Sequence, residues 1–583
     1  MKIVPSEKIQ PAWWRETSVY QIYPASFKDA NGDGFGDLQG ILSKLDYLKE
    51  LNVESIWLSP IYPSPLKDMG YDVSNYKEID ARYGSLEDTI VLAKELHKRG
   101  MKLVMDLVLN HTSDQHDWFK ESRSSKTNPK RDWYIWRPAK YNKDGKRLPP
   151  NNWRSYFDTS AWEWDEATEE YYLHLWAPEQ PDINWESPEL RKAVYDIVRF
   201  WLERGVDGFR LDVINMISKN QEFPDAPITD DRYDYQMGYK YYANGPRIHE
   251  YLKELGEILH EYNAFSVGEM PHVEDTEEVL RVVGADRREL TMIFQFDLVS
   301  LDLVPGKHKY VEGTWKLSDL KKSVKKWQSV YLKGGGWNAS FIENHDQPRT
   351  VSRYLSDSPA YRAQSSKLMA LFIVFQGGTP FVYQGQELAL ANIPRDWPVS
   401  EYVDIETQNF WKLFMSGNPT PEEIQKTMDI VNMRARDNGR TPMHWDGSPN
   451  GGFCPKDVKP WMRVTEDYTE WNASSQVGNP NSVYSFWSAS LGYRKSMKDA
   501  VVYGSFELLS EEDPSIVAFV RESKSTELLV ILNFTENSVH YECPLQIGGF
   551  NVLLNNYEDL EIKENVVHLN PYQGILLKKS FTA

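Results

Sequence analysis

Short apolar, β-rich runs alternate with helix-like stretches along most of the chain, which predicts an α/β protein built on a (β/α)₈ TIM barrel. Acidic residues end several of the runs, as expected where the loops above a barrel carry an active site. An open, doubly wound sheet is the structural alternative, and it fits functional residues at many strand ends less well. The runs lie at residues 19–24, 55–60, 102–108, 208–213, 264–269, 291–297, 338–346 and 380–386.

The stretches between the runs carry helical patterns. Apolar residues from Ile41 to Leu51 recur at helical spacing in LQGILSKLDYLKELNV, which predicts a helix between the first two runs. After the second run, Ser85 precedes an acidic residue by three positions and Gly100 follows the last turn, so a capped helix is expected between them. Helices between successive strands are what a parallel barrel requires.

Three regions depart from the barrel pattern. After the third run the chain turns polar and aromatic, which predicts a small domain inserted over the barrel mouth. Near the C-terminus, short alternating strands separated by turn residues predict an antiparallel β-sandwich domain. The predicted parts are the first part of the barrel (1–110), the inserted domain (111–186), the second part of the barrel (187–504, with an irregular excursion at 388–461) and the C-terminal domain (505–583).

The composition of the 583-residue chain is that of an ordinary globular enzyme, with 41% hydrophobic and 26% charged residues. A net charge of −19 argues against nucleic acid and anionic membranes as partners, because both would be repelled. Aromatic residues make up 13% of the chain, which fits either a large core or a saccharide site.

The start of the chain has no apolar signal-peptide region, and no run of about 18 apolar residues occurs, so neither secretion nor membrane insertion is predicted. Cys454 and Cys543 have neither metal-ligand spacing nor a disulfide framework, and we expect free thiols. These features predict a cytoplasmic protein. The oligomeric state stays open, and a monomer is compatible with the sequence.

Three carboxylates, Asp212 in GFRLDV, Glu269 in FSVGE and Asp346 in FIENHD, lie at the ends of apolar runs. A carboxylate there is costly to desolvate, so each needs a reason to be present. One alone could be a helix cap, but three together predict convergence on one catalytic centre. Strand alternation puts Arg210 on the same face as Asp212, where a guanidinium would keep a nucleophile ionised. His345 adjoins Asp346, but no second histidine has ligand spacing, which disfavours a metal phosphohydrolase.

The segment NGDGFGDLQG and the residue before it are rich in oxygen ligands. Asp29, Asn31, Asp33 and Asp37, with the carbonyl of Phe35, match the start of a calcium-binding loop, so we expect a structural Ca²⁺ there. The glycines miss the spacing of a dinucleotide-binding loop, and the acidic side chains would repel a pyrophosphate. A turn rich in Gly and Asp, without an ion, is the alternative.

Four segments together resemble the signature segments of the α-amylase superfamily of retaining glycoside hydrolases (glycoside hydrolase family 13): DLVLNHTS (106–113), GFRLDVIN (208–215), SVGEM around Glu269, and FIENHD (341–346). QPDINW (180–185) is similar to the extra segment that marks the oligo-1,6-glucosidase and α-glucosidase branch. The resemblance covers nearly the whole chain. It implies small oligosaccharide substrates and catalysis without a cofactor.

The resemblance implies a role for each of the three carboxylates in a double displacement. Asp212 would be the nucleophile, Glu269 the general acid/base, and Asp346 the group that stabilises the distorted sugar in the transition state. Burial and the neighbouring Asp212 should raise the pKa of Glu269, whereas Arg210 should hold the pKa of Asp212 down.

The resemblance also implies the residues of a substrate pocket. His111 and His345 match histidines that hydrogen-bond sugar hydroxyls. Asp68 and Arg440 would clamp the distal hydroxyls, and Tyr71 would stack on the sugar ring. A pocket closed in this way implies exo-action on short substrates.

Four further residues belong to the implied pocket or its rim. Trp176 and Gln180, from the inserted domain, would line the pocket. Arg349 would either approach the acceptor side or form a surface ion pair. Val213, directly after the nucleophile, resembles isomaltase-type enzymes, which implies action on α-1,6 bonds without excluding maltose or sucrose. An apolar wall of this kind discriminates by only about 1–3 kcal/mol.

The leading interpretation is an exo-acting α-glucosidase. A sugar transglucosidase or isomerase could use the same intermediate, but SLDLV (300–304) departs from the Arg-rich segment of sucrose isomerases. A non-catalytic, amylase-like binding subunit would not need the three carboxylates that this chain has. An endo-acting amylase is disfavoured by the closed pocket.

Overall fold

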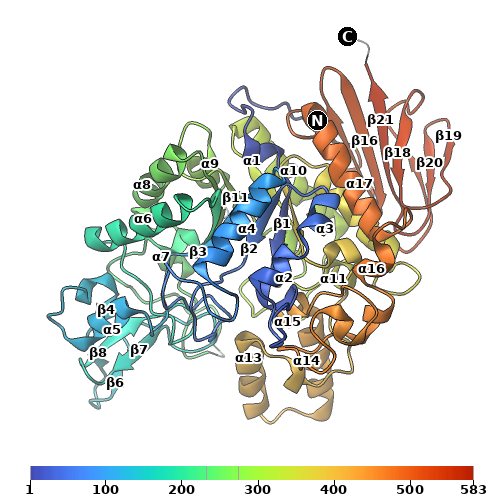
Figure 1. Cartoon of the computed structure of the whole chain (residues 1–583). Helices are drawn as coiled ribbons and strands as arrows, with labels where there is room; N and C mark the ends of the chain where they lie inside the picture. Colours follow the sequence, from blue (N-terminus) through green and yellow to red (C-terminus); the bar gives the residue numbers. More distant parts are fainter. Residues whose placement is uncertain (1, 232, 274, 582–583) are drawn as a thin grey trace.

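The computed structural model describes residues 2–231, 233–273 and 275–581. Eight parallel strands close a barrel at the centre of the molecule, in the spatial order β1-β13-β12-β11-β10-β9-β3-β2 (Figure 1). The TIM barrel expected from the sequence is confirmed, and each predicted run contains one strand. The strands are β1 (Val19–Ile22), β2 (Ser55–Leu58), β3 (Lys102–Val108), β9 (Gly208–Asp212), β10 (Phe265–Glu269), β11 (Met292–Phe294), β12 (Asn338–Ser340) and β13 (Thr379–Tyr383).

Helices connect the strands, and α12 lies between the barrel and the C-terminal sheets. All but two of its thirteen residues are buried, because α12 packs against the barrel on one side and against β16 and β21 on the other. The longer helices around the barrel are α4 (Leu86–Lys98), α6 (Pro188–Leu202), α8 (Ile248–Glu261), α9 (Thr276–Val283), α10 (Leu317–Gly334), α12 (Arg362–Val374) and α17 (Val483–Ser496). The shorter ones are α1 (Trp13–Glu16), α7 (Tyr239–Tyr242), α11 (Thr350–Arg353), α16 (Ala473–Gln476) and α18 (Lys498–Val501).

Of the two helices expected near the N-terminus, one is confirmed and the other is divided. Helix α4 begins with a capping box between Ser85 and Asp88, as the sequence predicts. The predicted helix after β1 is instead α2 (Leu38–Leu42) followed by α3 (Leu45–Glu50). The hydroxyl of Ser43 donates to the carbonyl of Gly40 (2.6 Å), a local bond that competes with continuing the helix.

The region after β3 forms a small unit beside the barrel mouth, drawn in cyan in Figure 1. A three-stranded sheet in the order β4-β8-β7 and a two-stranded hairpin, β5-β6, pack with one helix. The elements are α5 (Asp117–Ser124), β4 (Trp136–Arg137), β5 (Lys140–Tyr141), β6 (Arg147–Leu148), β7 (Trp162–Asp165) and β8 (Glu170–Leu173). No described helix or strand spans residues 110, 186 or 504, although the domain limits themselves stay a prediction.

The C-terminal region consists of antiparallel sheets, drawn in red in Figure 1. A five-stranded sheet has the order β14-β15-β16-β21-β18, and a three-stranded sheet has the order β17-β20-β19. The predicted antiparallel domain is therefore confirmed. Its strands are β14 (Ser505–Leu508), β15 (Ile516–Glu522), β16 (Thr526–Asn533), β17 (Val539–Glu542), β18 (Asn551–Asn555), β19 (Glu561–Lys563), β20 (Val566–Leu569) and β21 (Gly574–Ser580).

The excursion at 388–461 is less irregular than the sequence pattern indicates. It contains α13 (Ile405–Ser416), α14 (Pro421–Arg434) and the short α15 (Asp437–Arg440), and the first two helices project below the barrel in Figure 1. Helix α14 has clear start signals that the pattern analysis passed over, since Thr420 forms a capping box with Glu423 and Pro421 occupies the first turn.

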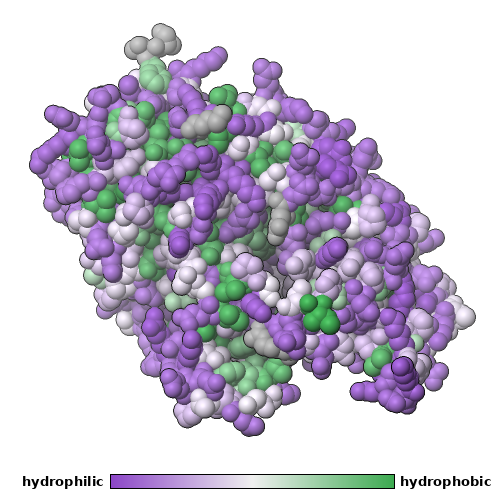
Figure 2. Space-filling model, turned by 180° about the vertical axis from the view of Figure 1, so that it is seen from behind, coloured by the Kyte–Doolittle hydropathy of each residue, from purple (hydrophilic) through white to green (hydrophobic). Residues whose placement is uncertain are grey.

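The outside of the molecule is mainly polar. Figure 2 shows one face covered largely by hydrophilic residues, with apolar residues in scattered groups. A helix that could cross a membrane is absent from the part of the chain that the structure describes.

Candidate active site

The carboxyl ends of β9 and β10 bring two of the predicted carboxylates together. Asp212 is the last residue of β9 and Glu269 the last residue of β10. Arg210 donates from Nη1 to Asp212 Oδ1 (2.6 Å) and from Nη2 to Glu269 Oε2 (2.6 Å). One buried guanidinium therefore holds both carboxylates at the mouth end of the barrel.

A hydrogen-bonded network extends from this pair to Asp346, in the loop beyond β12. Arg210 also donates to Asp106 Oδ1 on β3 (3.0 Å), and the Tyr71 hydroxyl donates to Asp106 Oδ2 (3.0 Å). The same hydroxyl lies 2.7 Å from His345 Nε2, and this nitrogen lies 3.1 Å from Asp346 Oδ2. The connected network supports the predicted convergence of the three carboxylates on one centre.

The pKa values of the first two carboxyls are raised together. Burial raises the pKa of Glu269 to about 7, with Arg210 opposing the rise and Asp212 adding to it. Burial also raises the pKa of Asp212 to about 7; Arg210 lowers this pKa, as expected, but burial outweighs it. The guanidinium is shared with Glu269 and Asp106, and it offsets only part of the desolvation cost. The two carboxyls therefore titrate as a coupled pair around neutral pH.

Asp346 has the opposite electrostatic environment. Burial would raise its pKa, but His345, Arg436 and Arg440 outweigh burial and hold the pKa well below its ordinary value. Arg440 Nη2 donates to Asp346 Oδ1 over 2.9 Å, and Arg436 Nη1 donates to the same oxygen over 3.2 Å. Asp346 is therefore ionised at neutral pH, where the other two carboxyls share a proton.

One end of the pocket, which we call the donor end, is formed by Asp68, Tyr71, His111, Trp176 and Gln180. Gln180 Nε2 donates to Asp68 Oδ2 (3.2 Å) and lies 3.3 Å from His111 Nε2. The His111 ring lies 4.9 Å from the Trp176 ring, and its Nε2 is 3.1 Å from the Tyr71 carbonyl oxygen. Burial lowers the pKa of His111 to about 4, so its imidazole is neutral near pH 7. All five predicted residues therefore meet at one end of the pocket.

Arg436, just before α15, is the cation that contacts the donor end, and no sequence pattern predicted it. Its Nη2 donates to Asp68 Oδ1 (3.0 Å) and lies 2.8 Å from Asp404 Oδ2. Arg440, which the resemblance implied beside Asp68, instead donates to Asp346 and to Asp404 Oδ2 (2.8 Å). The sequence did contain a signal for Arg436. In RARDNGR it lies four residues before Arg440, and residues at this spacing lie on the same side of a helical turn.

Asp106 and Asp404 are also site residues that the sequence analysis did not single out. Asp106 carries the same signal as the three predicted carboxylates, because it is an acidic residue within an apolar strand. Asp404 lies in the excursion, where no strand pattern marks it, and it caps the first turn of α13.

Arg349 lies in the interior of the barrel. Its side chain is fully buried, donates to the Gln384 carbonyl (2.7 Å) and lies 3.4 Å from Glu343 Oε2. The alternative of a surface ion pair is therefore wrong. An acceptor-side role stays a prediction, and Arg349 is not among the described residues that line the cleft beyond Asp346.

Val213 has an unusual backbone conformation directly after Asp212. Its φ of 36° lies in the left-handed region, which is rare for a β-branched residue and marks stored strain at functional positions. This conformation directs its backbone N–H to Glu269 Oε2 at 3.3 Å. The Val213 side chain is buried in a cluster with Trp153 and Met216. Residue 213 therefore joins the candidate acid/base to the core of the inserted unit.

Beyond the carboxylates the pocket opens into a cleft, which we call the acceptor cleft. Its walls come from the inserted unit, the loop after β11 and the region around α13 and α15. The lining residues are Tyr156, Phe157, Trp176, Leu303, Lys309, Asp346, Gln347, Pro348, Arg353, Glu406, Arg434 and Arg436.

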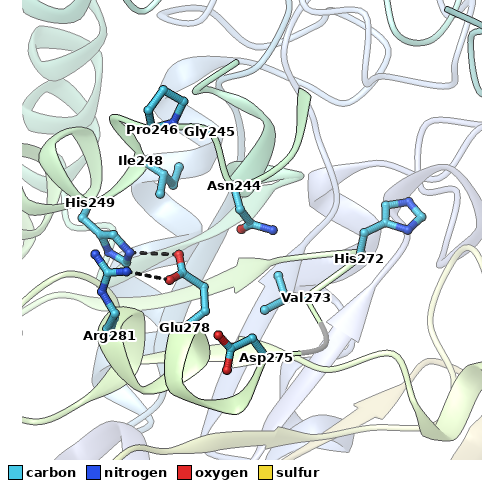
Figure 3. A pocket seen from close by; sticks show the side chains of 10 residues that line it. All are labelled: Asn244, Gly245, Pro246, Ile248, His249, His272, Val273, Asp275, Glu278 and Arg281. Carbon is cyan, nitrogen blue, oxygen red and sulfur yellow. Dashed lines mark hydrogen bonds and ion pairs between the residues drawn. The ribbon is translucent and has the colours of Figure 1, made fainter. Parts of the chain in front are cut away.

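A separate surface pocket lies between α8 and α9 (Figure 3). There His249 lies 2.9 Å from Glu278 and 2.8 Å from Glu289, and Arg281 donates to Glu278 (3.0 Å). These polar groups satisfy one another, and no predicted site residue is among the described residues that line the pocket.

The predicted calcium-loop residues lie in one turn between β1 and α2. Asp29 accepts backbone N–H bonds from Gly32 (2.6 Å) and Gly34 (2.9 Å), and Asp37 accepts one from Asn31 (3.0 Å). Asp29 and Asp37 are buried, and neither forms an ion pair with a described Lys or Arg. Within the described residues, no three His, Cys, Asp or Glu side chains are arranged to hold a metal ion.

Comparisons with known proteins agree with this geometry. Residues 21–504 match the model of the α-amylase catalytic domain, and residues 516–576 match that of the α-amylase SusG C-terminal domain. The chain belongs to the α-amylase family. Proteins of this glycoside hydrolase family need no cofactor for catalysis.

Relatives within the family match over nearly their whole lengths. An α-glucosidase of Schizosaccharomyces pombe is 77% identical over 99% of this chain and 100% of its own. An oligo-1,6-glucosidase of Parageobacillus thermoglucosidasius is 46% identical over 98% of this chain and 99% of its own. The crystal structure of a trehalose-6-phosphate hydrolase of Bacillus licheniformis superposes with a TM-score of 0.90, at 41% identity, over 97% of this chain and 100% of that one.

Proposed function

We propose that the protein is a retaining, exo-acting α-glucosidase that releases glucose from the non-reducing end of short α-glucosides. The observation that carries the proposal is the pair of 2.6 Å bonds from Arg210 to Asp212 and Glu269. Hydrolysis with retention of the anomeric configuration requires two carboxyl groups about 5–5.5 Å apart. Carboxylates bonded to the two Nη atoms of one guanidinium are held at a spacing of this order.

In the first step, Asp212 attacks the anomeric carbon while the glycosidic C–O bond breaks. Glu269 donates its proton to the departing oxygen, so the leaving sugar departs as a neutral alcohol. The raised pKa values of the pair support this division, since one shared proton supplies both an acid and a nucleophile at neutral pH. The ionised Asp346 stabilises the positive charge that develops on the sugar.

In the second step, Glu269 is a carboxylate and removes a proton from water. The water oxygen bonds to the anomeric carbon as the bond to Asp212 breaks, which gives α-glucose and restores the proton on Glu269. A sugar hydroxyl that replaces water would give transfer, so some transglycosylation at high sugar concentration follows from the same intermediate.

The donor end supports exo-action. Asp68 and Arg436 form a buried, charge-assisted pair that suits the distal hydroxyls of a terminal glucose. Neutral His111 and the Gln180 amide add hydrogen-bonding groups. A terminal glucose would fill the donor end, and the rest of the substrate would extend into the acceptor cleft.

Azide rescue tests the assignment of the two roles. Asp212→Ala should lose activity by about 10⁴-fold or more. Azide would then attack the face that Asp212 vacates and give β-glucosyl azide. Glu269→Ala, given an aryl glucoside with a good leaving group, should still form the glycosyl-enzyme, and azide should give α-glucosyl azide. Product anomers are read by NMR. Substantial activity of Asp212→Ala without azide, or one anomer from both variants, would overturn the proposal.

The proposed substrates include isomaltose, with maltose and sucrose as further candidates. The oligo-1,6-glucosidase among the relatives and the valine at position 213 support action on α-1,6 bonds. Turnover of these three sugars, followed by released glucose, tests the range of linkages.

We also propose that the loop of residues 29–37 binds a structural Ca²⁺. All its potential ligands are oxygens, as a hard cation requires, and its buried carboxylates keep free lone pairs beside the backbone bonds that they accept. Metal analysis of the purified protein and the change of Tm on chelation test this. The same measurements on Asp29→Ala provide the control.

We further propose that the protein acts in the cytoplasm. Its two cysteines are buried and unpaired, which suits a reducing compartment. Fractionation of the source cells with antibody detection tests the compartment.

A further inference from the structure

The loop of residues 29–37 is joined to the rest of the molecule through Trp461. The backbone N–H of Trp461 donates to the Gly34 carbonyl (2.9 Å), and its ring stacks on Phe35 at 5.8 Å and 24°. Gly34 has a φ of 92°, and a Cβ there would lie 2.3 Å from the Lys459 carbonyl oxygen. The loop is therefore packed tightly against the segment that carries Trp461.

On its other side, Trp461 contacts two residues that follow β1. Its ring lies 6.3 Å from that of Tyr23, and its Nε1 donates to Ser26 Oγ (3.1 Å). Ser26 Oγ donates in turn to the backbone carbonyl of Arg440 (2.5 Å). The ring of Tyr23 stacks on His345 at 6.1 Å and 16°, and the Arg440 guanidinium lies 5.5 Å from its centre.

His345 and Arg440 are two of the groups that bond to Asp346. A continuous path of contacts therefore leads from the loop through Trp461 to the carboxylate that stabilises the transition state. We infer that Trp461 is a positioning residue, through which the conformation of this loop sets the placement of Asp346. The inference rests on the role of Asp346 in the proposed function.

A displaced Asp346 would affect turnover more than affinity. Asp346 acts on charge that develops only in the transition state, so its misplacement lowers kcat and leaves KM nearly unchanged. The negative charge of Asp346 also helps to raise the pKa of Glu269, so moving Asp346 away from the pair lowers that pKa. The basic limb of the pH profile of kcat/KM, which reports Glu269 as the acid, would then move to lower pH.

Two substitutions separate the contacts of Trp461. Trp461→Leu removes the stack and the hydrogen bond, and kcat for isomaltose should fall about tenfold with KM changed less than about twofold. Trp461→Phe keeps an aromatic ring and removes only the bond to Ser26, so kcat should fall about threefold. Both variants should shift the basic limb to lower pH. If Trp461→Leu does not fold, the Phe variant alone decides the matter.

A double-mutant cycle tests the coupling to the loop. Phe35→Ala should lower kcat and shift the basic limb in the same direction, because Phe35 acts through Trp461. Adding Trp461→Leu to Phe35→Ala should cost little more, since both changes break one path. Trp136→Leu is the matched control, because Trp136 also donates from Nε1 to a serine Oγ (Ser122, 3.0 Å) and stacks on a phenylalanine (Phe119, 5.8 Å).

Three results would overturn the inference: a folded Trp461→Leu with unchanged kcat and pH profile, additive effects in the cycle, or an equal pH shift in Trp136→Leu. Failure of the proposed function is distinguishable, because the unmodified protein would then release no glucose from any α-glucoside. Circular dichroism and Tm of each variant show whether it is folded.

Discussion

The donor end of the pocket and the far rim of the acceptor cleft are held together in different ways. At the donor end, Asp68, His111 and Gln180 are almost completely buried and are joined by contacts of 3.2 and 3.3 Å. The far rim consists of three consecutive residues of the loop after β11, of which Lys309 lines the cleft. Each of these residues pairs with a different part of the chain: Lys307 with Asp230 (3.5 Å), His308 with Asp158 (3.3 Å) and Lys309 with Glu406.

This difference has an energetic meaning. Buried polar groups that lose a partner keep their full desolvation cost, so the donor end should tolerate little change. The two lysine pairs of the far rim are partly exposed, and such pairs contribute about 0–1 kcal/mol each and are screened by salt, so the far rim should tolerate more change at these lysines. The contact of His308 with Asp158 is buried and does not share this tolerance. We therefore expect the terminal glucose to be held by rigid contacts, and the leaving group to contact side chains that can change position.

The largest effect is expected at Arg436, which contacts Asp68, Asp346 and Asp404. Arg436→Ala would leave the buried Asp68 without its cation, while Arg440 still pairs with Asp346 and Asp404. Breaking a buried ion pair by removing one partner typically costs about 3–5 kcal/mol. We expect kcat/KM for isomaltose to fall by about 10²–10³-fold. Steady-state kinetics measure this. Arg436→Lys keeps the charge but loses the planar guanidinium fork, so its kcat/KM should lie between those of the unmodified protein and of Arg436→Ala. A loss below tenfold for the Ala variant would refute the role of the donor end.

Much of the catalytic centre could be predicted from the sequence, because its residues lie at or near the ends of barrel strands. Asp212 and Glu269 end β9 and β10, and the alternation in β9 correctly places Arg210 beside Asp212. Arg436 and Asp404 come from the excursion, where only the folded chain brings them to the pocket. Local sequence patterns carry no information about such long-range contacts.

The pKa of Asp212 was the other property of the site that the sequence could not predict. The presence of Arg210 was correctly taken as favouring an ionised Asp212, but burial contributes more to the pKa of Asp212 than the guanidinium does. The cost of burial depends on packing from several elements at once, which no single motif contains.

The next largest effect is expected at Val213, which directly follows Asp212 and donates its backbone N–H to Glu269. Val213→Thr exchanges a methyl group for a hydroxyl in a buried apolar cluster. We expect the ratio of isomaltose to maltose turnover to fall about tenfold, within the range of about 1–3 kcal/mol that an apolar wall supplies. Parallel kcat/KM measurements on the two sugars check this, and an unchanged ratio would contradict the linkage assignment.

A smaller effect concerns thermal stability. It tests whether burial dominates the pKa of Glu269. The pKa of Glu269 in the folded protein, about 7, lies above its ordinary value of 4.5. Its stabilising contribution is therefore fully present below pH 4.5 and is lost as the pH rises through about 7. Glu269→Gln has no proton to lose, so its Tm should exceed that of the unmodified protein by about 2 °C at pH 8. The two Tm values should converge at pH 5. Calorimetry across this range measures the difference, and a Tm advantage that does not depend on pH would point to a cause other than ionisation.

The smallest effect is expected at the far rim. Lys309→Ala removes the ion pair with Glu406 on the wall of the acceptor cleft, and should raise KM for isomaltose about two- to threefold with kcat nearly unchanged. Lys322→Ala is the matched control, since its pair with Asp319 (3.3 Å) lies on the exposed side of α10. Raising the salt concentration should reproduce part of the KM increase in the unmodified protein and little of it in Lys309→Ala, because screening acts on a contact that this variant has already lost. An equal KM increase in Lys322→Ala, or a loss of kcat that matches that of Arg436→Ala, would mean that the two ends of the pocket do not differ in the way that their contacts indicate.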